Sequence, residues 1–140
     1  MQDKRLQESV GYALVRAFRT VNRGTTRALS AHELSAEQAH ILLILWSNGP
    51  MKVGELQRTL ALGSGTLTGA LDRMEKASLV RRSPDPNDGR AYLVEPAPFD
   101  SKKKQRIERT LEGIERDSFA MLTTRERAEL FRLLTKLAGE

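Results

Sequence analysis

The segment from residue 53 to residue 96 constrains the fold more than any other part of this 140-residue chain. Two short helical patterns meet there at a tight polar turn, and a basic hairpin pattern follows them directly. In residues 53–60, Val53, Leu56 and Leu60 recur at the three- and four-residue spacing of an amphipathic helix. The apolar positions of residues 64–75 keep the same spacing: Leu67, Ala70, Leu71 and Met74.

The turn between these two patterns spans residues 61–64 and contains one glycine. Gly63 permits an unusual backbone angle, and the hydroxyl of Ser64 can accept a hydrogen bond from a first-turn amide. A short, glycine-containing turn between two helices is typical of a helix-turn-helix. The hairpin that follows extends this prediction to a winged helix-turn-helix.

The outward face of the second helix carries small or hydroxylated side chains and one cation: Ser64, Gly65, Thr66, Thr68, Gly69 and Arg73. Such a slim face lets a helix backbone approach the floor of a DNA groove. Serine and threonine can hydrogen-bond base edges or phosphates, and a threonine methyl can pack on a thymine methyl. The alternative is an ordinary solvated helix face, and the hairpin is what favours the DNA-binding interpretation.

Two strand-like runs, residues 79–82 and 91–95, flank a loop predicted over residues 83–90. Two prolines exclude a helix there, and Asp-Gly is a strong turn signal. The cations of this wing are Arg81, Arg82 and Arg90. Arg90, at the predicted tip, suits the negative potential of a narrow minor groove. We expect Asp88 to hold Arg90 through a charge-assisted hydrogen bond; the alternative is an incidental pair on a solvated hairpin.

Residues 71–82, Leu-Asp-Arg-Met-Glu-Lys-Ala-Ser-Leu-Val-Arg-Arg, are followed at residues 85–91 by Asp-Pro-Asn-Asp-Gly-Arg-Ala. This combination resembles the signature of the MarR family of bacterial transcriptional regulators. The resemblance implies that residues 64–77 form a recognition helix in the major groove and that Arg90 enters the minor groove. Members of this family commonly repress transcription, and many release DNA when a small, often phenolic or otherwise aromatic, compound binds, so the resemblance also implies a repressor with such an effector.

Composition agrees with a polyanionic partner. Lysine and arginine number 23 against 18 acidic residues, and the formal net charge is +5. A basic domain attracts nucleic acid, although charge alone does not identify the partner. The chain has no cysteine, which excludes disulfides and cysteine-ligated zinc and fits a reducing cytosol. No signal peptide and no apolar run of about 20 residues is present, so we expect a cytoplasmic protein that does not enter a membrane.

The rest of the chain predicts helices. An apolar stripe runs from Leu6 to Val21 and weakens at residues 22–24, and a capping box at residues 35–38 opens a helix that stops at residues 49–50. Asp100 can cap a long helix whose apolar positions are Ile107, Leu111, Ile114, Phe119 and Leu122. A second capping box at residues 123–126 opens a terminal helix with Leu130, Leu133, Leu134 and Leu137 as its apolar positions.

The predicted fold is therefore mainly α with a small β-hairpin wing and about six helices. We expect one domain over residues 1–140, with a self-contained DNA-binding lobe at 36–98 and dimerisation helices at 1–30 and 99–140. Both chain ends supply an apolar stripe that needs a partner surface, which favours a homodimer; the alternative is packing within one chain. A two-fold dimer would recognise a pseudo-palindromic operator.

The remaining candidate sites are weaker. Tyr12, Phe18, His40 and Trp46 could line an effector cavity between the dimerisation helices and the lobe, although aromatic side chains on helices are more often core. With two histidines and no cysteine, no metal site or cofactor is expected. The basic run at residues 102–106 is attributed to solvation of a helix start, with DNA contact as its alternative.

Two other classes of function require features that this sequence lacks. A winged-helix module that binds proteins instead of DNA predicts a neutral or acidic wing, and three arginines contradict that. An enzyme requires a catalytic cluster, whereas most acidic residues here stand beside lysine or arginine on helix surfaces. The chain is therefore predicted not to be an enzyme.

Overall fold

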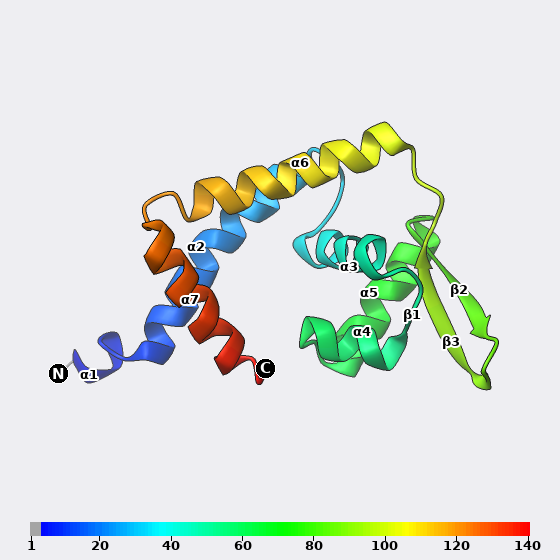
Figure 1. Ribbon diagram of the computed structural model, residues 1–140, viewed down its shortest axis with the longest axis horizontal. Helices are drawn as coiled ribbons and strands as arrows, with labels where there is room; N and C mark the ends of the chain where they lie inside the picture. The colour runs from blue at the N-terminus through cyan, green and yellow to red at the C-terminus, as the bar shows by residue number, and fades with distance from the viewer. Residues whose placement is uncertain (1–3) are drawn as a thin grey trace.

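The computed structural model describes residues 4–140 and consists mainly of helices with a small antiparallel sheet (Figure 1). The helices in this range are α1 (Lys4–Gln7), α2 (Val10–Ser30), α3 (Ala36–Asn48), α4 (Val53–Leu60), α5 (Ser64–Lys76), α6 (Ser101–Ser118) and α7 (Thr124–Leu137). The strands are β1 (Met51–Lys52), β2 (Val80–Asp85) and β3 (Asp88–Pro96), in the sheet order β1-β3-β2. The predicted fold class, a winged helix-turn-helix with additional helices at both chain ends, is confirmed.

Local side-chain chemistry sets most helix boundaries. Ser35 and Thr123 each form the predicted capping box, and Asp100 caps α6 by accepting from the backbone amide of Lys102. Helix α3 ends at Gly49, whose φ of 77° lies in the region that favours glycine. Ser9 caps α2 and separates it from the single turn of α1, so residues 4–140 contain seven helices instead of about six.

Two helices differ in length from their predicted patterns. Helix α2 continues through residues 22–24 as far as Ser30, because its buried residues there, Thr25 and Leu29, anchor its second half. Helix α6 ends at Ser118, so Phe119 is its C-cap residue and Leu122 lies in the link to α7. Both residues were predicted as helix positions because they keep the apolar spacing beyond the last helical turn.

The turn between α4 and α5 uses a different residue from the one predicted. Ala61 adopts the left-handed conformation, with φ at 52°, while Gly63 has an extended backbone with φ at −66°. Gly63 is the N-cap residue of α5, and no side chain caps this helix. Ser64 is therefore the first helical residue, and its predicted capping role was wrong.

The wing is longer and its loop shorter than predicted. Strands β2 and β3 pair from Val80↔Pro96 to Asp85↔Asp88, which leaves a two-residue turn where residues 83–90 were expected to form a loop. Pro84 fits into β2 because this strand lies at the sheet edge, where a missing amide donor is tolerated. The two-residue strand β1 pairs with β3 and was not predicted, since two residues show no periodicity.

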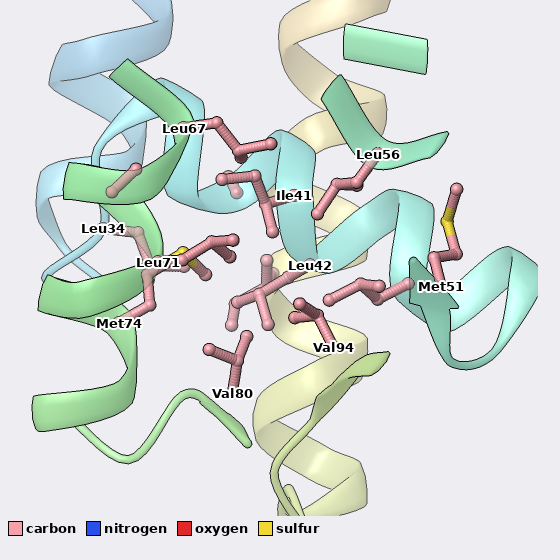
Figure 2. Close-up of a cluster of buried hydrophobic side chains, with 14 of the residues drawn as sticks. Leu34, Ile41, Leu42, Met51, Leu56, Leu67, Leu71, Met74, Val80 and Val94 are labelled. Carbon is pink, nitrogen blue, oxygen red and sulfur yellow. The ribbon is translucent and has the colours of Figure 1, made fainter. Parts of the chain in front are cut away.

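Side chains from α3, α4, α5 and the sheet meet in one hydrophobic core (Figure 2). Its buried members include Leu42, Leu56, Leu71, Met74 and Val94. Leu29 of α2 and Ile107 of α6 belong to the same cluster, and both are 0% exposed. The sequence had suggested a self-contained lobe. The structure differs, because the end of α2 and the first half of α6 complete the core of the lobe.

The chain ends extend away from this core. Figure 1 shows α6 running from the lobe to the region where α2 and α7 cross, with both termini on that side. Large apolar side chains there remain in contact with solvent: Leu6, Val10, Phe18, Met121, Phe131 and Leu137 are 63–83% exposed. No helix between residues 4 and 140 combines the length and apolar character needed to cross a lipid bilayer.

Candidate nucleic-acid interface

Helix α5 has two contrasting faces. Leu67, Ala70, Leu71 and Met74 are buried in the core, as predicted from their spacing. The opposite face is polar and accessible: Ser64, Gly65, Thr66, Thr68 and Arg73 are exposed, and Gly69 is half-buried. The small and hydroxylated side chains named from the sequence therefore do lie together on one accessible helix surface.

The start of α5 is open to a ligand, and Gly69 leaves room for the Arg73 side chain. Because no side chain caps α5, its first-turn amides remain available as hydrogen-bond donors. A Cβ atom at Gly69 would lie 3.3 Å from Nη1 of Arg73. The Arg73 guanidinium thus lies back along the helix over Gly69, and the absence of a side chain at residue 69 leaves it room.

The three arginines of the wing have different surroundings. Nη2 of Arg82 lies 2.9 Å from Oδ1 of Asp72, and its Nε lies 3.9 Å from Glu75. Arg81 pairs with Glu95 across the hairpin at 3.3 Å. Within residues 4–140, Arg90 is exposed and makes no ion pair. The sequence assigned positive charge to all three wing arginines. In the described part of the chain, carboxylates neutralise Arg81 and Arg82, and Arg90 keeps its charge uncompensated.

Asp88 and Arg90 interact through different atoms from those predicted. Oδ1 of Asp88 accepts a hydrogen bond from the backbone amide of Arg90, at 3.0 Å. The carboxylate thereby fixes the backbone two residues ahead, as aspartate commonly does in turns. This leaves the guanidinium of Arg90 free to extend from the hairpin, whereas the predicted contact would have held it back.

Two residues that the sequence analysis missed stabilise the wing from the opposite face. The Asp85 side chain is 3% exposed, and Oδ2 lies 3.7 Å from Nζ of Lys52, the residue before α4. Its Oδ1 accepts from the amide of Asn87 at 2.9 Å. The Asp-Pro-Asn run is a turn signal that pointed to the second contact, but nothing in the sequence indicated that Asp85 is buried.

A cavity of about 760 Å³ opens where α2, α3 and α6 meet the start of α7. Phe18 and His40, two of the four predicted pocket residues, line it. Tyr12 and Trp46 do not: Tyr12 lies beneath Arg16, and Trp46 packs edge-on against Phe99 at 5.4 Å between ring centroids. The other lining residues are Val21, Asn22, Thr25, Leu43, Glu108, Leu111, Glu112, Ile114, Glu115, Arg116, Phe119 and Arg127.

The chemistry of this cavity is mixed. Phe18 and Leu43 form part of its apolar wall, and charged side chains from α6 and α7 also line it. Desolvation by the surrounding protein lowers the pKa of His40 below its ordinary value, and the Glu37 carboxylate acts in the opposite direction, while the residue as a whole stays partly exposed. A neutral imidazole beside apolar and aromatic groups can pack against a planar ligand and hydrogen-bond it.

The basic run at the start of α6 contacts aromatic rings. Nζ of Lys103 lies 5.6 Å from the Phe99 ring centroid, and Nζ of Lys104 lies 5.3 Å from that of Trp46. Lys104 also pairs with Glu108 at 3.8 Å. Cations are electrostatically unfavourable at the start of a helix. The contacts with aromatic rings and with Glu108 explain why two of these lysines are nevertheless placed there.

Among residues 4–140, no three histidine or acidic side chains are placed to hold a metal ion. His32 instead bonds Thr110 of α6, with 2.8 Å between Nε2 and Oγ1. This contact ties the segment between α2 and α3 to α6.

The fold, the accessible polar helix and the adjacent hairpin define a winged helix-turn-helix protein. Residues 34–92 match the model of the MarR family. The winged helix-turn-helix of this chain therefore belongs to the MarR family, as the signature at residues 71–91 predicted.

Individual relatives extend this likeness. The chain is 35% identical over 95 residues to the HTH-type transcriptional regulator YcgE from Bacillus subtilis, an alignment covering 68% of this chain and 62% of that protein. The chain spans less than two thirds of the length of the first curated relatives it matches. These relatives are named as transcriptional regulators, not as enzymes.

Two solved structures share the fold over almost the whole chain. BpsR from Bordetella bronchiseptica, described with the regulation of its DNA binding by 6-hydroxynicotinic acid, has a TM-score of 0.82 and 26% identity over 94% of this chain and 99% of that one. A MarR mutant from E. coli complexed with operator DNA has a TM-score of 0.78 and 26% identity, over 91% and 92%. The likeness thus includes the helices at the chain ends as well as the lobe.

Proposed function

We propose that this protein is a homodimeric transcriptional regulator that binds a specific, pseudo-palindromic duplex DNA site. The observation that carries the proposal is the exposed, hydroxyl-rich face of α5 beside a hairpin on which Arg90 is the cation without an ion pair among the described residues. Helix α5 enters the major groove, where Thr66 and Thr68 contact base edges. Arg90 enters the adjacent minor groove. The DNA-bound structure of a MarR relative with the same fold supports this assignment.

The dimer is formed by the helices at the two chain ends. Large exposed apolar side chains on α2 and α7 support this, because exposed apolar side chains gathered on two helices mark an interaction surface. Residues 36–98 then act as the DNA-binding lobe, and residues 1–30 and 99–140 supply the dimer contacts. A two-fold axis between two such lobes places the α5 helices about one DNA turn apart.

The regulator acts as a repressor in the cytoplasm, and a small aromatic or phenolic effector releases it from DNA. The cavity beside Phe18 and His40 supports this role, since it lies between the dimerisation helices and the lobe. A ligand that binds more tightly when the lobes are wrongly spaced for DNA weakens DNA binding by that difference in affinity. The relative whose DNA binding 6-hydroxynicotinic acid regulates supports the same assignment.

The decisive experiment is selection of bound fragments from a pool of random duplex DNA with the purified full chain. We expect a two-fold symmetric motif with half-site centres about 10 base pairs apart. Affinity for the selected duplex should also fall steeply as salt rises, because cationic side chains displace counterions from phosphates. A protein that enriches no sequence at moderate salt, with or without a panel of phenols and aromatic carboxylates, would overturn the proposal.

A further inference from the structure

The contact between Lys52 and Asp85 joins the far end of the wing to the start of the helix-turn-helix. Asp85 precedes the two-residue turn of the hairpin, at the one register irregularity of the β2·β3 ladder. Lys52 is the last residue of β1 and the N-cap residue of α4. The two residues are 33 positions apart by their numbers, yet Nζ and Oδ2 are separated by 3.7 Å. The interaction thus bridges two elements whose relative position the local sequence does not fix.

The surroundings of the Asp85 carboxylate make this contact necessary. The side chain is 3% exposed, and among the described residues Oδ2 has no hydrogen-bond donor. Removing an ionised carboxylate from water is costly unless an opposite charge compensates it. Lys52, whose side chain is 51% exposed, supplies that charge while its ammonium group stays hydrated. Without Lys52, the free energy of the carboxylate would be lower in water than in its buried site.

Such a movement would displace the end of the hairpin. Oδ1 of Asp85 also holds the amide of Asn87, so the side chain and the turn are coupled. Arg90 follows the turn, and its own backbone is fixed by Asp88. A shift of Asp85 therefore changes where the guanidinium of Arg90 lies relative to α5.

We propose that the Lys52–Asp85 ion pair is a positioning element that sets the distance between wing and recognition helix, and so fixes Arg90 for minor-groove contact. This inference rests on the proposed DNA-binding function. Neither residue needs to touch DNA. Arg82, which joins β2 to Asp72 and Glu75 of α5, restrains the hairpin on its other face. The two contacts together hold the wing against both helices of the helix-turn-helix.

The variant Asp85→Asn distinguishes a positioning role of Asp85 from a direct effect of its charge on DNA affinity. Asp85→Asn removes a negative charge near the DNA, so charge alone predicts tighter binding. Asparagine keeps an oxygen for the Asn87 amide but no longer attracts Lys52. The positioning role predicts weaker binding to the duplex recovered by selection. The expected loss is roughly 5- to 150-fold, the equivalent of one groove contact.

Lysine variants complete the design. Lys52→Met should lose affinity to a similar extent, whereas Lys52→Arg keeps the charge and should bind like the unmodified protein. Asp117→Asn, the same substitution on an exposed side chain at the far end of α6, is the matched control and should change nothing. Hydroxyl-radical footprints of Asp85→Asn should lose protection at the flanking minor grooves and keep it in the major grooves.

One readout does not involve DNA. Hydrogen exchange at the backbone amides of residues 87–90 should accelerate in Asp85→Asn and Lys52→Met, while exchange in α5 stays unchanged. If the unmodified protein selects a duplex but Asp85→Asn binds it equally or more tightly, the positioning role is wrong and the proposed function stands. If the unmodified protein selects no duplex, the proposed function fails, and unchanged exchange in the variants would then also refute the positioning role.

Discussion

The lobe formed by α3, α4, α5 and the sheet buries its apolar side chains, whereas the chain-end helices leave many of theirs exposed. In the lobe, Leu42, Leu56, Leu67 and Leu71 are 0% exposed and pack around one centre (Figure 2). On α2 and α7, residues of the same chemical type, such as Phe18, Phe131 and Leu137, are 63–71% exposed. Both regions contain helices with side-chain caps, α3 in the lobe and α2 and α7 at the chain ends, and both contain amphipathic helices. Amphipathic pattern therefore predicts that a face will be buried, but not whether the same chain buries it.

The difference indicates two separate sources of stability. The lobe is stabilised by its own core, to which the end of α2 and the start of α6 contribute. The outer part of α2 and α7 leaves large apolar side chains exposed in one copy of the chain, and in the proposed dimer a second copy covers them. Stability of the lobe should therefore be independent of protein concentration, and stability of the chain-end helices should depend on it.

Leucine-to-alanine substitution in the two regions should have different consequences. Leu71→Ala opens a cavity in the lobe and should lower the free energy of unfolding by about 2–5 kcal/mol at any protein concentration. Leu137→Ala is the matched control, because Leu137 is 68% exposed. Its cost should appear only at concentrations where the dimer forms, as measured by urea unfolding at low and high concentration. Equal, concentration-independent losses in both variants would contradict the two-source account.

A charge placed on α7 should break the dimer without unfolding the lobe. Phe131→Asp puts a carboxylate on the exposed apolar face and should weaken association by about 2–4 kcal/mol, the range of an interface hot spot. Analytical ultracentrifugation measures the shift to monomer, and circular dichroism checks that the helices remain. Phe131→Leu, which stays apolar, is the control and should still dimerise. Identical association of Phe131→Asp and the unmodified protein would place the interface elsewhere.

Loss of the wing cation should affect DNA binding and not folding. Arg90→Ala should weaken binding to the selected duplex by about 1–3 kcal/mol, because it removes the minor-groove contact. Titration of labelled duplex measures the affinity, and the urea midpoint should not move, since Arg90 is exposed and unpaired within the described residues. Arg81→Ala, whose guanidinium pairs with Glu95, should cost less. Unchanged affinity in Arg90→Ala would remove the wing from DNA recognition.

His40, at the junction of the two regions, should give a small pH dependence of stability. Burial lowers its pKa in the folded state below the ordinary value of 6.5, so the unfolded chain binds a proton more readily. Its contribution to stability is complete above pH 6.5 and is lost as the pH falls from there towards the folded-state pKa. Urea unfolding at pH 5.5 and 7.5 should show this loss, and His40→Gln should reduce it.

Glu37 provides the complementary variant. Its carboxylate raises the pKa of His40, so Glu37→Gln should lower that pKa further and enlarge the loss of stability at acid pH. A pH profile that is identical in the unmodified protein and both variants would show that the His40 ring is equally accessible in the folded and unfolded states.

Much of the local structure was predictable because its causes are local. The capping boxes at Ser35 and Thr123, the cap at Asp100 and the end of α3 at Gly49 each depend on residues a few positions apart. The MarR signature likewise lies in one contiguous stretch. The errors have the opposite character. The roles of Ala61, Gly63 and Ser64 were exchanged because several residues in one short turn can supply a left-handed angle or a cap.

In the candidate site, the residue types were predicted and their partners were not. The slim face of α5 follows from helical periodicity, so its members could be named in advance. The partners depend on how separate elements pack. Arg82 pairs with Asp72, and Asp85 is buried beside Lys52. Phe18 and His40 share a cavity that Tyr12 and Trp46 do not line.

The sequence alone determined the class of fold, the helix that carries the polar face and the cation that the wing presents, because periodicity, caps and turn residues act over a few positions. Only the tertiary structure decided which charges are neutralised within the chain, which apolar faces are covered and where a cavity remains. Those properties depend on contacts between elements distant in sequence, and a periodic pattern specifies that a face needs a partner without specifying which one.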